Sequence, residues 1–96
     1  MIFSLSKVKG KSMSPKFNEG DFILSIKKPF FRLKAGDAVL FYKTPYGKLL
    51  KEVKEVNKNS LFVLGTHPQS TDSRVFGKIL KKDVEAKVLL RIKSSR

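Results

Sequence analysis

The apolar residues of this chain fall into short runs separated by turn-forming residues, and this spacing limits the possible fold more than any other feature. The runs at residues 22–26, 38–42 and 60–64 have Gly, Asn, Asp or Pro nearby on both sides, which is typical of strands joined by turns. Residues 84–93 largely alternate between apolar and polar side chains, which predicts a half-buried strand. The sequence therefore predicts a small, mostly antiparallel all-β domain that covers residues 1–96.

Helical signals are weak, since only residues 78–83 suggest a helical turn. Residues 65–77 are predicted to form a polar loop. Two Gly-Asp pairs, Gly20-Asp21 and Gly36-Asp37, each precede an apolar run. Because glycine and a side-chain acceptor suit a backbone reversal, we interpret both pairs as structural turns and assign neither aspartate a catalytic role.

The charge of the chain is strongly unbalanced. It has 21 Lys and Arg residues against 8 Asp and Glu, a formal net charge of +13, which attracts nucleic acids, anionic membranes and acidic proteins. The basic residues are spread along the chain without a nucleic-acid-binding motif, so nucleic acid is a disfavoured partner.

The adjacent Phe30 and Phe31 cannot share one face of a strand. If one of them is exposed beside Lys27, Lys28 and Arg32, it could contact an anionic membrane surface. We favour packing of this aromatic residue in the core or in a loop.

The composition also limits the compartment and the cofactors that we expect. The chain has no cysteine and a single histidine, His67, so thiolate sites are excluded and a histidine metal site would need more ligands. No apolar stretch approaches the roughly 18 residues of a spanning helix, and the N-terminal alternation is too short for a signal-peptide core. We expect a cytoplasmic protein without metal or cofactor, and the oligomeric state stays open.

Ser12 lies in the turn sequence Gly-Lys-Ser-Met-Ser-Pro of residues 10–15. A serine hydroxyl is a poor nucleophile at neutral pH and needs a base within hydrogen-bond reach. The candidates for this base are His67 and a lysine made neutral by burial. In a strand over residues 48–54, Lys51 would share a face with two aliphatic residues. Burial lowers the pKa of a lysine, and its neutral amine can accept a proton, although the same pattern also suits a lysine that reaches solvent.

The polar loop at residues 65–77 adds a third group of side chains. Asp72 and Arg74 can pair and stiffen this loop, and Ser70 could orient a neutral lysine amine. By itself the loop has the composition of a well-capped turn. We interpret His67 as an ordinary surface or loop histidine.

Taken in order along the chain, these residues resemble the type I signal peptidase family of Ser-Lys proteases, from about residue 8 to residue 88. The matching motifs are Gly10-x-Ser12-Met13-x-Pro15, Gly20-Asp21, Gly36-Asp37-Ala38-Val39, Leu50-Lys51, Gly65 and Ser70-x-Asp72-Ser73-Arg74-x-x-Gly77. The Ser-Met-x-Pro motif is shared with the self-cleaving LexA-type repressors, whereas the Ser-x-Asp-Ser-Arg motif favours the signal peptidase branch.

The resemblance implies that Ser12 is the nucleophile and that Lys51 is the general base, and later the general acid for the leaving amine. The backbone N–H of Ser12 would donate to the oxyanion. Substrates of the family lie extended against strands beside the site, with small side chains just before the cut. The family fold is a strongly bent antiparallel β-structure.

The same resemblance implies supporting roles around this dyad. Ser70 would position the lysine amine, and Asp72 and Arg74 would support the site by pairing. Met13 would pack beneath the nucleophile. Gly10 stands where bacterial enzymes often have a serine as a further oxyanion donor, as it does in organellar and related small members.

The chain departs from the family pattern at several other positions. Glu52 follows the lysine where arginine is usual, Thr66-His67 replaces Asp-Asn, and Lys16 replaces threonine. No N-terminal anchor and no large inserted domain are expected. In this the chain is similar to small soluble members such as the proteases that mature nickel-type superoxide dismutase.

The sequence therefore favours a serine endopeptidase that removes a leader or N-terminal extension from a protein or peptide substrate through an acyl-enzyme. The alternative is a non-catalytic basic β-barrel module that binds nucleic acid or an anionic membrane surface. A LexA-like self-cleaving switch would need a cleavable segment and usually a DNA-binding domain, for which we see no room.

Overall fold

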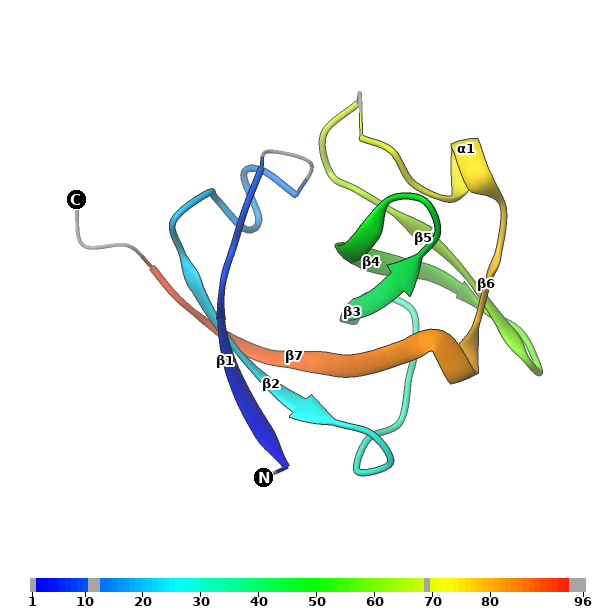
Figure 1. The fold of residues 1–96 in the computed structure, drawn as a ribbon, viewed down its shortest axis with the longest axis horizontal. Helices are drawn as coiled ribbons and strands as arrows, with labels where there is room; N and C mark the ends of the chain where they lie inside the picture. The colour runs from blue at the N-terminus through cyan, green and yellow to red at the C-terminus, as the bar shows by residue number, and fades with distance from the viewer. Residues whose placement is uncertain (1, 11–12, 69, 94–96) are drawn as a thin grey trace.

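The computed structural model of the protein describes residues 2–10, 13–68 and 70–93. These residues form one seven-stranded antiparallel sheet with the strand order β1-β2-β7-β3-β4-β5-β6, which confirms the predicted all-β class (Figure 1). The elements in chain order are β1 (Phe3–Lys7), β2 (Phe22–Lys27), β3 (Ala38–Lys43), β4 (Gly47–Val56), β5 (Ser60–Leu64), α1 (Ser73–Phe76), β6 (Ile79–Leu80), the 3₁₀ turn η1 (Lys81–Asp83) and β7 (Val84–Ile92).

The strand β3 separates two hydrophobic cores. Ala38 and Leu40 belong to the core that also contains Met13, whereas Val39 and Phe41 belong to the other. Since neighbouring side chains of a strand point to opposite faces, each face of β3 packs into a different core. This explains why residues 38–42 read as a short apolar run without alternation: a strand covered on both sides needs apolar residues at every position.

The strand β7 departs from the regular alternation that the sequence predicts. Glu85 is an extra residue against β3, and Leu89 is an extra residue against β2. Each extra residue is a β-bulge, which bends the strand and increases its twist. As a result Val84 and Ala86, two positions apart, lie in different cores, and β7 curves across the molecule in Figure 1. Beyond the second bulge Leu90 is 48% exposed, so the half-buried face ends there.

The structure differs from the prediction in two places, the polar loop of residues 65–77 and the helical turn expected over residues 78–83. A helical turn, α1, forms within residues 65–77, because Asp72 caps its N-terminus by accepting a hydrogen bond from the Arg74 backbone N–H. The turn expected over residues 78–83 forms only at η1, since Ile79–Leu80 pair with β5 as β6.

Both Gly-Asp pairs form the same kind of turn. The Asp21 and Asp37 carboxylates each accept a hydrogen bond from the backbone N–H three residues earlier, at 3.0 and 2.9 Å. The glycine before each aspartate has a positive φ, 93° at Gly20 and 99° at Gly36, which L-residues with a side chain rarely adopt. These contacts give both aspartates a structural use.

The two adjacent phenylalanines separate as expected for neighbouring residues. Phe31 packs against the second core, and Phe30 remains 56% exposed. Within the described part of the chain, no helix is long and apolar enough to cross a membrane.

Candidate active site

Lys51 lies in the middle of β4, which pairs with β3 on one side and with β5 on the other. Its side chain shares a strand face with Leu49 and Val53, and only 2% of the residue is exposed. Burial lowers the pKa of the Lys51 amine, the cation of Arg74 acts in the same direction, and the carboxylate of Asp72 opposes both. Because a lowered pKa enlarges the neutral fraction of the amine, Lys51 is a candidate general base.

The Asp72 carboxylate is the centre of a buried hydrogen-bond network. It accepts two hydrogen bonds from the Arg74 guanidinium, from Nε at 3.0 Å and from Nη2 at 2.8 Å, and a further one from the Ser70 hydroxyl. Burial alone would raise the pKa of Asp72, but the hydrogen bonds from Arg74, Ser70 and the Gly65 backbone hold it well below its usual range. Asp72 is therefore a fixed anion that Arg74 neutralises.

This network is attached directly to the strand beside β4. The Gly65 backbone N–H donates to Asp72 Oδ2 at 2.8 Å, and the Val63 backbone N–H donates to Ser73 Oγ at 2.8 Å. Both donors lie on β5 or directly after it, and β5 pairs with β4. The sheet thus fixes the Asp72–Arg74 pair where both charges act on the pKa of Lys51. The contact expected between Ser70 and the lysine amine stays a prediction, since the hydroxyl of Ser70 contacts Asp72 and Arg74.

Ser12 lies outside the described residues, and Gly10 and Met13 are the nearest described residues on either side of it. Gly10 has a φ of 80°, and a Cβ there would contact nothing within 4 Å, so backbone conformation rather than space favours glycine. Met13 is 2% exposed in the first core together with Phe17, whose backbone N–H donates to the Met13 carbonyl at 2.8 Å. The residue after Ser12 is thus anchored in the core.

Three elements contact the turn that follows Met13. The Thr66 hydroxyl donates to the Ser14 carbonyl at 2.8 Å, and Arg91 Nη1 of β7 donates to the Lys16 carbonyl at 2.6 Å. The Lys16 ammonium forms an ion pair with Glu52 of β4 at 3.1 Å. Sequence reasoning missed these contacts, although it singled out Lys16, Glu52 and Thr66 as departures from a family pattern. The opposite charges of Lys16 and Glu52 were the available signal.

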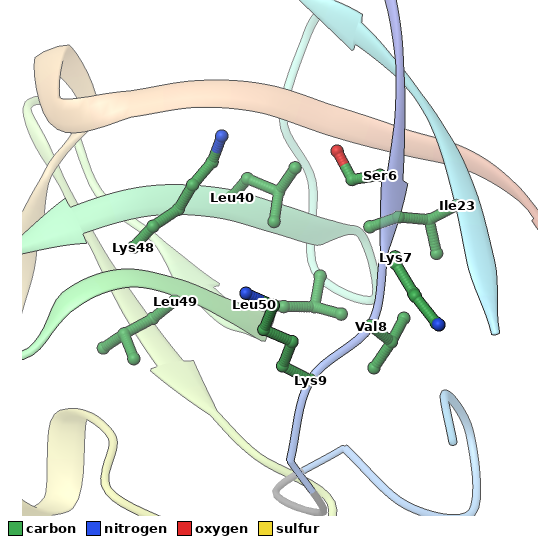
Figure 2. Close-up of a pocket in the computed structure, with 9 residues that line it drawn as sticks. All are labelled: Ser6, Lys7, Val8, Lys9, Ile23, Leu40, Lys48, Leu49 and Leu50. Carbon is green, nitrogen blue, oxygen red and sulfur yellow. The ribbon is translucent and has the colours of Figure 1, made fainter. Parts of the chain in front are cut away.

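Two adjacent cavities lie near Lys51, and Lys51 lines the smaller of them. A small cavity of about 70 Å³ is lined by residues that include Gly10, Met13 and Lys51, so both neighbours of the undescribed segment meet the buried lysine there. A larger pocket of about 290 Å³ lies beside it between β1 and β4. Figure 2 shows Leu40 and Leu50 within this pocket and Lys9 extending toward β4. Lys9, Val8 and Leu49 are among the residues that line both cavities.

His67 and the acidic residues offer no metal centre in the described part of the chain, where no group of three or more His, Cys, Asp or Glu side chains could hold an ion. His67 is half-buried in the loop after β5, and its carbonyl accepts a hydrogen bond from the Ser70 backbone N–H at 3.1 Å.

Comparison with known protein families identifies a related family. The sequence profile of a family described as "Signal peptidase, peptidase S26" matches residues 43–93, a segment that contains Lys51 and the Ser70–Asp72–Arg74 network. No curated protein matches the chain.

Proposed function

Because the chain belongs to the signal peptidase family, peptidase S26, we propose that it is a Ser-Lys endopeptidase that removes a leader or N-terminal extension from a protein substrate. At the level of the family it is a signal peptidase-like serine peptidase acting on proteins or peptides. The proposal adds that Ser12 is the nucleophile, that Lys51 is the base, and that residues 1–96 act as one peptidase domain.

The small cavity beside Lys51 is the observation that carries this proposal. The buried Lys51 and the residues Gly10 and Met13, which lie on either side of the Ser12 segment, line it together. A lysine in such surroundings has a lowered pKa because burial disfavours its charged form. A serine close to a neutral amine is the combination that nucleophilic catalysis without histidine requires.

In the proposed reaction, the Ser12 Oγ attacks the carbonyl carbon of the scissile peptide bond while the neutral Lys51 Nζ accepts the hydroxyl proton. The Ser12 backbone N–H donates to the oxyanion of the tetrahedral intermediate. When the C–N bond breaks, the Lys51 ammonium returns the proton to the leaving amine and an acyl-enzyme remains. Lys51 then accepts a proton from water as the water oxygen attacks the ester carbonyl carbon. When the ester C–O bond breaks, the Lys51 ammonium returns this proton to Ser12 Oγ and the carboxylic acid product leaves.

The pocket between β1 and β4 supports an extended substrate beside this dyad. It is bordered by β1, which is an edge strand of the sheet, and an edge strand can pair with an added peptide strand. The pocket interior is apolar at Val8, Leu40 and Leu50, which suits substrate side chains without charge.

The proposal is tested by incubating the purified protein with proteins extracted from its source cells and identifying new N-termini by mass spectrometry. Ser12→Ala is expected to reduce the appearance of these termini by at least about a thousand-fold. Lys54→Met, a change at an exposed lysine of the same strand, is the control and should leave them unchanged. Equal cleavage by the parent and by a folded Ser12→Ala variant would exclude the serine mechanism and favour a non-catalytic basic module.

A further inference from the structure

The pocket between β1 and β4 combines an apolar interior with basic side chains at its border. Lys7, Lys9 and Lys48 are among the residues that line it, and no acidic residue of the described chain does so. Lys48 is partly neutralised by Glu85 at 3.5 Å. Neither Lys7 nor Lys9 forms an ion pair with a described carboxylate, and both are exposed. Two unneutralised ammonium groups therefore lie at the border of an apolar pocket.

The position of Lys9 relates this charge to the site. Lys9 is next to Gly10 and lines both the larger pocket and the small cavity of Lys51. Figure 2 shows its side chain reaching from the end of β1 toward Leu50 on β4. A chain segment lying in the pocket would pass close to the Lys9 ammonium, and a carboxylate on that segment would gain an ion pair without displacing one.

We propose that this pocket selects a peptide segment that has aliphatic side chains for its interior and Asp or Glu side chains beside them for Lys7 and Lys9. This specificity rests on the proposed peptidase function, since it describes the segment presented to Ser12. The pocket volume of about 290 Å³ lies at the lower limit for small-ligand sites and suits a few side chains of an extended segment. The overall charge of +13 steers such a segment toward the protein, and the two lysines determine where its carboxylates bind.

Binding of non-cleaved peptides tests the specificity separately from catalysis. The probes are two fluorescent decapeptides of alanine and valine that carry either two Glu or two Gln residues beside a central valine. Their affinities for the Ser12→Ala variant are measured by fluorescence anisotropy at 50 mM NaCl. We expect the Glu peptide to bind about fivefold more tightly, since each partly exposed ion pair contributes a modest amount. In 500 mM NaCl this preference should fall toward unity because salt screens exposed charges.

A matched pair of double variants separates the local effect from net charge. Lys7→Gln with Lys9→Gln should reduce the preference to less than twofold. Lys58→Gln with Lys82→Gln removes the same charge from two exposed lysines that do not line the pocket and should keep it. Equal losses in both double variants, or no preference in the parent, would overturn the proposal.

Two further outcomes are informative. If Lys7→Gln with Lys9→Gln weakens binding to phosphatidylserine vesicles or to a single-stranded dodecanucleotide but leaves the peptide preference intact, the lysines serve a different anion and the proposal is wrong. If the preference is found but cleavage does not depend on Ser12, the pocket specificity stands and the proposed peptidase mechanism fails.

Discussion

The two sides of the candidate site are held in place by different means. Lys51 belongs to an inner strand, where backbone pairing to β3 and β5 fixes its position and burial sets its pKa. The turn next to Ser12 has no sheet partner and is held by the Met13 anchor and by the side chains of Thr66, Glu52 and Arg91. The position of Lys51 is therefore fixed by backbone pairing, whereas the position of the turn depends on several weak side-chain contacts that can be changed one at a time.

Lys51→Met should show the largest effect. It also separates activity from stability, because the two are expected to change in opposite directions. Loss of the base is expected to reduce cleavage by at least about a thousand-fold. The same change should raise the free energy of unfolding by on the order of 1 kcal/mol at neutral pH, because burial of the lysine amine is unfavourable and the Met side chain is apolar. Urea unfolding and cleavage assays on the same preparation measure both effects.

The stability difference between the parent and Lys51→Met should depend on pH. The folded-state pKa of Lys51 lies below the unfolded value of 10.5, so the folded protein binds fewer protons between the two values and its stability rises with pH in that window. The advantage of Lys51→Met should accordingly shrink as the pH approaches 10.5. A variant that is less stable than the parent at every pH would contradict the view of Lys51 as a buried amine.

Asp72→Asn is expected to have the next largest effect, on stability. It weakens the hydrogen bonds that the buried carboxylate accepts from Arg74, Ser70 and the Gly65 backbone, a type of loss that costs about 2 kcal/mol. The folded-state pKa of Asp72 lies below the unfolded value of 3.8, so the stabilisation is present above pH 3.8 and is lost as the pH falls further. Denaturation curves from pH 2 to pH 7 should show the difference between parent and variant narrowing as the pH falls below 3.8. Asp83→Asn, at an exposed position, should not reproduce the difference.

Arg74→Gln should have a smaller effect on activity, and the size of this effect should depend on pH. The Arg74 cation lowers the pKa of Lys51, and the Asp72 anion raises it, so removing the cation shifts the pH profile of kcat/KM to higher pH. Activity at pH 7.5 is expected to fall about three- to tenfold, with recovery in alkaline solution. Arg32→Gln, at an exposed arginine, serves as the control. A loss that is equal at all pH values would mean that Arg74 only stabilises the loop.

The Lys16–Glu52 ion pair tests the other side of the site and should give the smallest effect. Lys16→Glu places two carboxylates together and is expected to lower kcat about two- to fivefold, in line with the small contribution of partly exposed pairs. Lys16→Glu combined with Glu52→Lys restores opposite charges and should recover most of the loss. If the double variant is as impaired as the single one, the ion pair does not position the turn.

The sequence predicted the inner strands well because their signals are local. Residues 38–42 and 60–64 lie in β3 and β5, and alternation placed Lys51 with Leu49 and Val53. The pairing of Asp72 with Arg74 was also accessible, since the two residues lie close together in the chain.

The features that the sequence did not predict depend on distant partners. A bulge on β7 is defined by its pairing with β3 and β2, so the alternation of residues 84–93 alone could not reveal that Val84 and Ala86 enter different cores. Lys16 contacts Glu52 from 36 positions away, and Thr66 contacts Ser14 from 52 positions away. The short helix α1 forms because the buried Asp72 both caps it and binds Arg74.

The place of β7 in the sheet has a consequence for biosynthesis. β7 follows every other strand in the chain, yet it lies between β2 and β3 and joins β1-β2 to the four-strand half of the sheet. A nascent chain without β7 cannot connect β1, which precedes Ser12 in the chain, to Lys51 on β4 through the sheet. Assembly of the proposed dyad is therefore tied to the synthesis and pairing of β7, and proteolytic activity waits until that strand has docked between β2 and β3.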